Sequence, residues 1–249
     1  VMKVASLIYG EYRTFETAIK AWNILDYDNI DYYVSTWDRS REQSIKLNYN
    51  NDFKVDEDMI SKYLPSAKIS LKNHSIWDEG TLEDYFWPAH YHWKCLYEMV
   101  EESKIKYDII ILHRLDCYLY LHEFVNLINN LDSNTLYSLI PIHKNHNNDW
   151  WSADTFFMGN SDVMLDFLSK IPKYMDDPHV ELAYFIKSLK YSCISHPDVY
   201  SNIIRNTMTT YFDNYFKNNK TLLFNDEYFK YFLQVYEKNI HGRLESEYK

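Results

Sequence analysis

The order of apolar segments at the start of the chain constrains the fold most. KVASLIY at residues 3–9 is a continuous apolar run, as expected for a strand that is covered on both faces. Gly10 ends this run, and residues 13–25 then carry apolar side chains at helical spacing. IDYYVST at residues 30–36 has the pattern of a second strand. A strand, a helix and a strand in this order predict a parallel sheet with a right-handed crossover.

The rest of the chain continues the alternation of strands and helices. Further strands are predicted at residues 67–72, 107–112, 135–141 and 154–160. Helices are predicted at residues 56–64, 88–104, 122–131, 161–171, 179–190 and 225–238. The polar stretch at 37–52 is predicted to be a loop. With 249 residues and no repeat or convincing linker, the chain is interpreted as one α/β domain.

Composition excludes several kinds of site. Only 4 of the 249 residues are glycine, where average usage would give about 7%. Neither G-x-G-x-x-G nor G-x-x-x-x-G-K-[ST] occurs, and G-x-S-x-G and H-E-x-x-H are absent as well. Phosphate groups must therefore be bound by side chains or by a metal ion rather than by a glycine-rich backbone loop.

Charge and cysteine content limit which partners the protein is expected to bind and which cell compartment it is expected to occupy. The formal net charge of −10 argues against a nucleic-acid partner, and it repels anionic substrates unless local cations or a metal reverse the sign. Cys95, Cys117 and Cys193 show no C-x-x-C spacing, which indicates free thiols in a reducing compartment such as the cytoplasm. No apolar run approaches the length of about 18 residues that marks a membrane span, so we expect no transmembrane segment.

Polar side chains gather where three of the predicted strands end. In open α/β sheets, ligands bind beyond the carboxyl ends of the strands, so polar groups from neighbouring strands meet there. The three groups are Arg13 after the first strand, Trp37 and Asp38 after the second, and His113, Arg114 and Asp116 after the strand at 107–112.

These residue types suit phosphate groups. Arg13 and Arg114 could each bind phosphate oxygens in bidentate fashion, and Asp116 could ligate a hard divalent cation, which prefers oxygen ligands. Bland alternatives stay open for the same residues. Arg114 and Asp116 could form a surface ion pair of little energy, Arg13 could brace the first loop, and His113 could be a packed residue.

Four segments together resemble GT-A-type glycosyltransferases, in particular small viral and bacterial nucleotide-sugar-dependent sugar transferases. The segments are SLIYGEYRTFE at 6–16, DYYVSTWD at 31–38, the stretch from YHWK to LYL at 91–121, and ADTFFMGNSDVMLDFL at 153–168. The resemblance implies a Rossmann-like central sheet, mixed but mostly parallel, that is flanked by helices and followed by a helical C-terminal part. It also implies a nucleotide-binding half at 1–120 and a sugar and acceptor half at 121–249.

The resemblance implies transfer of a sugar from a nucleotide-diphospho-sugar, with UDP as the expected nucleotide, to a carbohydrate or glycoprotein acceptor. A viral source would place this activity in the host cytoplasm. The residues expected to bind the donor are Gly10, Arg13, Trp37, Asp38, Lys94, His113, Arg114 and Asp116. Two other classes remain: a non-catalytic nucleotide- or sugar-binding module of the same fold, and a nucleotidyltransferase, for which a glycine-rich activation loop is missing. The oligomeric state is open.

The metal motif that the resemblance implies is altered in this chain. The family carries D-x-D where this sequence reads R-L-D, so Arg114 stands in place of the first aspartate. Two expectations follow. Either Mn²⁺ or Mg²⁺ is held by Asp116 with a distant histidine, His196, or Arg114 neutralises the diphosphate itself.

Two carboxylates are candidates for catalysis. Asp154 begins the strand predicted at 154–160 and follows Trp150 and Trp151, which are either core residues or a platform for a sugar ring. Its carboxylate could bind hydroxyls of the donor sugar or act as the general base that takes the acceptor proton. The alternative for Asp154 is a turn cap. Glu181, on the helix predicted at 179–190, is the next candidate.

Overall fold

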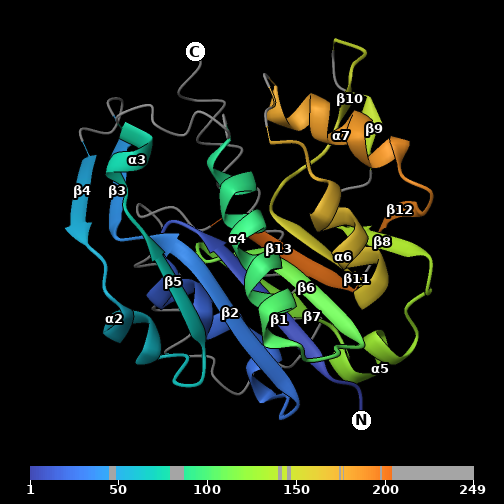
Figure 1. Ribbon diagram of the computed structural model, residues 1–249, viewed down its shortest axis with the longest axis horizontal. Helices are drawn as coiled ribbons and strands as arrows, with labels where there is room; N and C mark the ends of the chain where they lie inside the picture. Colours follow the sequence, from blue (N-terminus) through green and yellow to red (C-terminus); the bar gives the residue numbers. More distant parts are fainter. Residues whose placement is uncertain are drawn as a thin grey trace. The chain divides into compact units, whose positions relative to one another are not determined.

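A computed structural model describes residues 1–44, 49–78, 87–139, 142–144, 147–173, 175, 177–196 and 198–203 (Figure 1). The chain divides into two units, 1–206 and 207–249, and all described residues belong to the first. The predicted helix at 225–238, and with it the helical C-terminal part, lies outside the described residues. Within the described part, no helix has the length and apolar character needed to span a bilayer.

A seven-stranded sheet forms the centre of the described part. Its strands, in order across the sheet, are β12 (Ser192–Ser195), β8 (Thr135–Ser138), β11 (Phe156–Asn160), β6 (Ile109–Arg114), β1 (Val4–Gly10), β2 (Ile30–Trp37) and β5 (Lys68–Lys72). β11 runs antiparallel to both of its neighbours, and the other pairings are parallel. The prediction of a mixed, mostly parallel sheet is confirmed.

Helices and short segments cover both faces of this sheet. On one face lie α4 (Pro88–Ser103), α6 (Ser161–Lys170) and α7 (Pro178–Ser188). On the other face lie α1 (Phe15–Ala18), the 3-10 turns η1 (Ile19–Ala21) and η2 (Asn23–Asp26), α2 (Glu57–Ser61), β7 (Cys117–Leu121) and α5 (Phe124–Asn129). Successive residues of a strand point to opposite faces, so each central strand contributes to both cores. Ile111 packs on the α1 side and Leu112 on the α4 side.

The helix α4 shows how the sequence sets these elements. Pro88 occupies its first turn, where the missing backbone N–H costs nothing. Trp93, Leu96 and Val100 recur at helical spacing and are buried against the sheet. The helix ends at Lys104, which adopts the left-handed conformation with φ of 55°.

The prediction of a loop at 37–52 is wrong, because β3 (Arg39–Ser44) and β4 (Tyr49–Lys54) pair there as an antiparallel hairpin. The residues are too polar to show an apolar alternation. Their pairing depends instead on backbone hydrogen bonds and on cross-strand contacts such as that of Arg39 with Asp52, at 2.5 Å from Nη2 to Oδ2.

Smaller elements also differ from the predictions. The helix predicted at 13–25 is broken into α1 and the two 3-10 turns, and the strand predicted at 154–160 begins only at Phe156. No sequence pattern predicted β7, β12 or β13 (Val199–Ile203) as separate strands, and β13 pairs with β7. The remaining elements are the short helix α3 (Ser75–Asp78) and the two-residue strands β9 (His143–Lys144) and β10 (Trp150–Trp151).

Candidate functional site

The carboxyl ends of β1 and β6 bring two charged segments together. The two strands are parallel neighbours with Tyr9 opposite Arg114, and the N–H of Leu115 donates to the carbonyl of Tyr9 at 2.8 Å. Gly10 follows with φ of +106°, a backbone conformation that side-chain-bearing residues rarely adopt. This turn directs the chain towards Arg13 at the same edge of the sheet.

Asp116 holds the two arginines of this edge. Its Oδ1 accepts from Nε of Arg114 at 2.8 Å and its Oδ2 from Nη2 at 2.9 Å, so the pair is bidentate. Nη1 of Arg13 lies 3.5 Å from the same Oδ2. The carboxylate is fully buried, which excludes the alternative of a surface ion pair. We call Arg13 and Arg114 the arginine pair.

Two further carboxylates border the arginine pair. Nε of Arg13 donates to Oε2 of Glu11 at 3.0 Å, and Nη1 of Arg114 lies 3.8 Å from Oδ2 of Asp154. The backbone carbonyl of Asp154 accepts a hydrogen bond from the hydroxyl of Tyr9. Glu11, Asp116 and Asp154, with the arginine pair, form what we call the strand-end cluster.

The electrostatics keep both arginines charged. Burial disfavours the charged guanidinium of Arg114, but the Coulombic attraction of Asp116 and the hydrogen bonds to it prevail and raise its pKa well above the usual value. The same balance, with Asp116 and Glu11 as the anions, raises the pKa of Arg13. Arg114 has five N–H donors and gives two to Asp116. Its Nη1 is too far from Asp154 for a hydrogen bond, so donors remain for a ligand.

His113 does not face this cluster. The alternation along β6 places it on the opposite face of the sheet from Arg114, where it is fully buried. Its Nε2 lies 2.9 Å from Oγ of Ser6, and its ring meets Trp22 edge-on at 4.6 Å. Burial lowers its pKa to about 3. The structure therefore packs His113 in the core, which favours the alternative of a packed residue over a contact of the donor.

Trp37 and Asp38 have structural contacts. Trp37 is 1% exposed and stacks on Tyr91 of α4 with ring centroids 5.8 Å apart. Oδ1 of Asp38 accepts from the N–H of His74 at 2.8 Å, which ties β2 to the segment after β5. Asp38 also lines an open pocket of about 560 Å³ beside the β3–β4 hairpin. Trp37 is thus core, whereas Asp38 lies at a hollow near the strand ends.

Lys94 contacts residues of its own helix, and Glu181 contacts the residue before its helix. Nζ of Lys94 lies 3.9 Å from Oε1 of Glu98 and 4.7 Å from the ring of Tyr97, both on α4. Oε1 of Glu181 accepts from the N–H of Asp177 at 3.3 Å, at the start of α7. Lys94 as a donor contact and Glu181 as a catalyst stay predictions.

His196 lies away from Asp116. Its Nδ1 is 3.7 Å from Oδ2 of Asp198, whose carbonyl accepts from the N–H of His122 just beyond the end of β7. Asp116 precedes the start of β7, and a strand rises about 3.3 Å per residue, which separates the two ends by roughly 17 Å. The expectation that one ion is shared by Asp116 and His196 does not fit this geometry.

Each of the two tryptophans before Asp154 has two neighbours at its ring. Nζ of Lys187 lies 3.7 Å from the ring centroid of Trp150, and the ring of His179 stacks on Trp151 at 5.0 Å. Both tryptophans are half-buried. Nζ of Lys144 also lies 5.6 Å from the ring centroid of Trp150, and the ring of His143 lies 5.4 Å from that of Trp151. A sugar platform at these rings stays a prediction.

Sequence reasoning missed His90. The residue is fully buried in α4, and neither of its ring nitrogens has a hydrogen-bond partner. Burial, with a smaller contribution from His179, lowers its pKa to about 4. The histidine pair in the HYH sequence at 90–92 was a visible signal, but a spacing of two does not suit one face of a helix.

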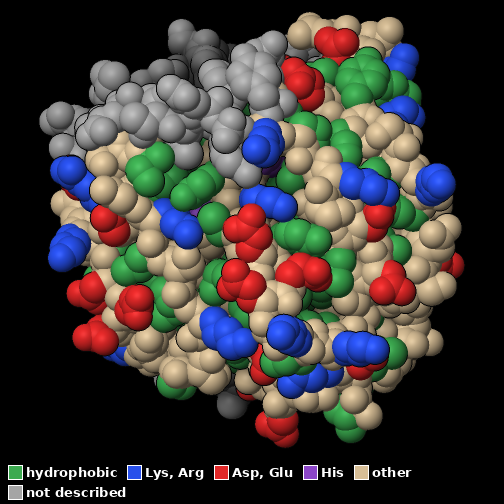
Figure 2. Space-filling model, in the orientation of Figure 1, with side chains coloured by type: hydrophobic (Ala, Val, Ile, Leu, Met, Phe, Trp, Pro, Cys, Tyr) green, Lys and Arg blue, Asp and Glu red, His purple; other side chains and the backbone are tan. Residues whose placement is uncertain are grey.

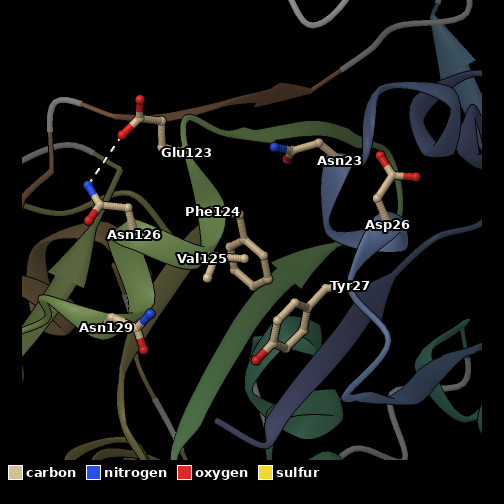
Figure 3. A pocket seen from close by; sticks show the side chains of 8 residues that line it. All are labelled: Asn23, Asp26, Tyr27, Glu123, Phe124, Val125, Asn126 and Asn129. Carbon is tan, nitrogen blue, oxygen red and sulfur yellow. Dashed lines mark hydrogen bonds between the residues drawn. The ribbon is translucent and has the colours of Figure 1, made fainter. Parts of the chain in front are cut away.

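A second hollow lies between residues of η2 and α5 (Figure 3). It measures about 530 Å³ and is lined by Asn23, Asp26, Tyr27, Glu123, Phe124, Val125, Asn126 and Asn129. Asp26 and Tyr27 lead into the first residue of β2, so the hollow lies towards the amino ends of the strands. Its charged lining residues are both acidic, which does not suit an anionic donor.

No protein-family model matches the sequence, and no curated protein matches it either. Among solved structures, the chain is similar to the glycosyltransferase GlyE from Streptococcus pneumoniae TIGR4, with 10% identity and a TM-score of 0.39 over 78% of this chain and 45% of that chain. An active-site mutant of LgtC matches with 8% identity and a TM-score of 0.43 over 78% and 72% of the two chains.

A nucleotidyl transferase from Methanothermobacter thermautotroptrophicus matches with 9% identity and a TM-score of 0.39, over 79% of this chain and 88% of that one. The chain thus spans less than half of GlyE and most of the other two. With TM-scores below 0.5, these likenesses assign neither a family nor an activity to the chain. Function is therefore inferred from the site.

Proposed function

We propose that the protein transfers a sugar from a nucleotide-diphospho-sugar donor to a carbohydrate or glycoprotein acceptor. The observation that carries the proposal is the arginine pair, fixed by Asp116 at the carboxyl edge of a mostly parallel sheet. Ligands of open α/β sheets bind at this edge. The resemblance of the four sequence segments to GT-A-type glycosyltransferases supports the same assignment.

The chemistry of the cluster suits a diphosphate leaving group. When the bond between the sugar and the diphosphate breaks, negative charge grows on the diphosphate, and donors already aimed at that position lower the barrier. The arginine pair is permanently charged, and its carboxylate contacts hold it in place before the donor binds. Such local cations are needed because the net charge of −10 of the chain repels an anionic donor.

Asp154 is the carboxylate best placed to act on the sugars. It is 5% exposed and lies near Arg114, which would face the diphosphate. In the proposed reaction it binds donor-sugar hydroxyls or takes the proton of the acceptor hydroxyl. Its backbone carbonyl is anchored by Tyr9, so its position is fixed without use of the carboxylate itself.

A thermal-shift screen tests the proposal directly. The protein is heated with each common nucleoside diphosphate and the matching nucleotide sugars. A ligand at 100 times its dissociation constant should stabilise the fold by about 2.7 kcal/mol. If no nucleoside diphosphate or nucleotide sugar shifts the transition, the proposed function is refuted.

Arg13→Ala is expected to weaken binding of the nucleoside diphosphate by about 10- to 100-fold, because a charged hydrogen bond contributes roughly 1.5–3 kcal/mol. The fold should lose little stability, since Arg114 still satisfies Asp116. Isothermal calorimetry measures the affinity. Lys170→Ala is the matched control, because Lys170 is exposed and pairs with Asp166 on its own helix, α6, and it is expected to bind the diphosphate as the wild type does. Equal affinity of Arg13→Ala and the wild type would remove Arg13 from the site.

Asp154→Asn distinguishes the two roles of Asp154. If the carboxylate is the general base, the variant should lose sugar transfer by about 100-fold or more and keep its affinity for the donor. If the carboxylate only binds hydroxyls, part of the turnover should survive, because the amide oxygen still accepts a hydrogen bond. Transfer assays and calorimetry on the same preparation separate the outcomes. A folded Asp154→Ala variant with wild-type transfer would exclude both roles.

A non-catalytic binding module is the second candidate. It is favoured by the R-L-D sequence and by the engagement of Asp116 with both arginines. Such a module would bind nucleotide sugars without consuming them. Release of the nucleoside diphosphate from a bound nucleotide sugar, even slowly and with water as acceptor, would decide for the enzyme.

A further inference from the structure

We infer that the arginine pair takes the place of a divalent cation, so that the donor diphosphate binds here without metal. This inference rests on the proposed function and concerns how the same site neutralises its ligand. It begins from Asp116, the one aspartate that the R-L-D sequence leaves available as a ligand.

The contacts of Asp116 do not fit a metal ligand. Both of its oxygens accept from Arg114, and Arg13 adds a third contact. A Mn²⁺ or Mg²⁺ ion would need to lie about 2.0–2.2 Å from one of these oxygens. At that distance it would also lie against two guanidinium groups in a buried setting, where like charges repel strongly.

The other ligands that an ion needs are missing from the described residues. No three His, Cys, Asp or Glu side chains are grouped there in a way that could hold a metal ion. His196 lies near the end of β7 that is far from Asp116, and Glu11 and Asp154 each face an arginine. The donor set near Asp116 is therefore dominated by N–H groups, which bind anions and not cations.

The exchange preserves the charge balance of the site. Two aspartates with one divalent cation sum to zero, and so do Arg114 and Asp116 alone. Arg114 thus replaces a ligand and its ion at once. Its planar fork also offers directed N–H donors to phosphate oxygens, and its bidentate bond to Asp116 fixes the direction of that fork before the donor arrives.

Calorimetry with nucleoside diphosphates tests the inference on the wild-type chain. ADP, CDP, GDP, UDP and dTDP are titrated first with excess EDTA and then with Mn²⁺. We expect the diphosphate that binds to do so with EDTA, and Mn²⁺ to leave its affinity unchanged or lower it, because the ion neutralises the ligand. A tenfold or larger gain of affinity with Mn²⁺ would overturn the inference and leave the proposed function standing. Binding of none of the five under either condition would refute both.

A direct metal titration gives a second readout that does not depend on a nucleotide. Electron paramagnetic resonance of free Mn²⁺ should show no tight site on the wild type. Arg114→Asp restores D-L-D and is expected to create such a site and to make diphosphate binding depend on Mn²⁺. A stoichiometric Mn²⁺ site on the wild type that Asp116→Asn removes would overturn the inference. If Arg114→Asp does not fold, the wild-type titrations decide.

Discussion

Asp116→Ala is expected to lower the free energy of unfolding by about 3–5 kcal/mol, because removal of one partner of a buried ion pair leaves the other charge uncompensated. Here two guanidinium groups would lose their common anion, since Arg13 and Arg114 both contact the fully buried carboxylate of Asp116. For a chain of this length, the loss corresponds to a fall in the melting temperature of roughly 10 °C. Urea unfolding followed by circular dichroism measures it.

The pair of Arg39 and Asp52 supplies a matched control. It is also bidentate, with both contacts at 2.5 Å, but the side chain of Arg39 is 50% exposed. Asp52→Ala is therefore expected to cost less than about 1 kcal/mol. If the two variants lose similar, small amounts of stability, Asp116 is solvated in solution. The site would then lack the rigid arginine pair on which the proposed function rests.

The sequence predicted the central elements of the fold because their apolar patterns are long and regular. The runs that became β1, β2 and β6 are each covered on both faces, and such strands show as continuous apolar segments. The β3–β4 hairpin was missed for the opposite reason. Its sequence is mostly polar and shows no apolar alternation, and its pairing joins residues that no local pattern relates.

The sequence predicted which residues lie together at the candidate site, but not the direction of each side chain. Arg13, Arg114 and Asp116 lie together because they stand at or just after the ends of two adjacent parallel strands. His113 shares the same strand end but points to the other face, because one residue along a strand reverses the side-chain direction. The sequence alone does not fix which of the two neighbours, His113 or Arg114, faces the ligand.

Surface charge fits a site that depends on local cations. On the face shown in Figure 2, Lys and Arg side chains are interspersed with Asp and Glu, without one extended basic area. An anionic donor is therefore not attracted by the surface of this face as a whole. In the proposed reaction, recognition comes from the few directed donors at the strand ends, so single changes in the arginine pair are expected to have large effects on affinity.

Acidification from pH 6.5 to pH 5 is expected to lower the free energy of unfolding by about 5 kcal/mol. His90, His92 and His113 are all buried, and burial lowers their pKa values to about 4, 3 and 3. His179 adds to the effect on His90, and Lys72 adds to the effect on His92. In the unfolded chain each imidazole has a pKa of about 6.5. Between the folded and the unfolded pKa values, the unfolded state binds more protons than the folded state does, so the free energy of unfolding falls as the pH falls.

At pH 6.5 each unfolded imidazole is already half protonated, and at pH 5 it is nearly fully protonated, so each histidine contributes about 1.6 kcal/mol over this interval. Total stabilities of about 5–15 kcal/mol are usual, so the loss brings the fold close to unfolding at pH 5. Unfolded carboxylates protonate near pH 4, so measurements at pH 5 and above report mainly on the histidines. Urea unfolding at several pH values gives the slope, which should approach three protons taken up on unfolding.

Two variants test whether buried imidazoles cause the dependence of the free energy of unfolding on pH. His113→Gln should reduce the slope by about one proton, because one imidazole no longer distinguishes the folded from the unfolded state. Ser6→Ala removes the hydroxyl that lies 2.9 Å from Nε2 of His113 but keeps the imidazole. It should lower stability at every pH by a similar amount and leave the slope nearly unchanged. A wild-type slope below one proton between pH 6.5 and pH 5 would contradict the burial of all three rings, and with it the packing of α4 and β6 around the site.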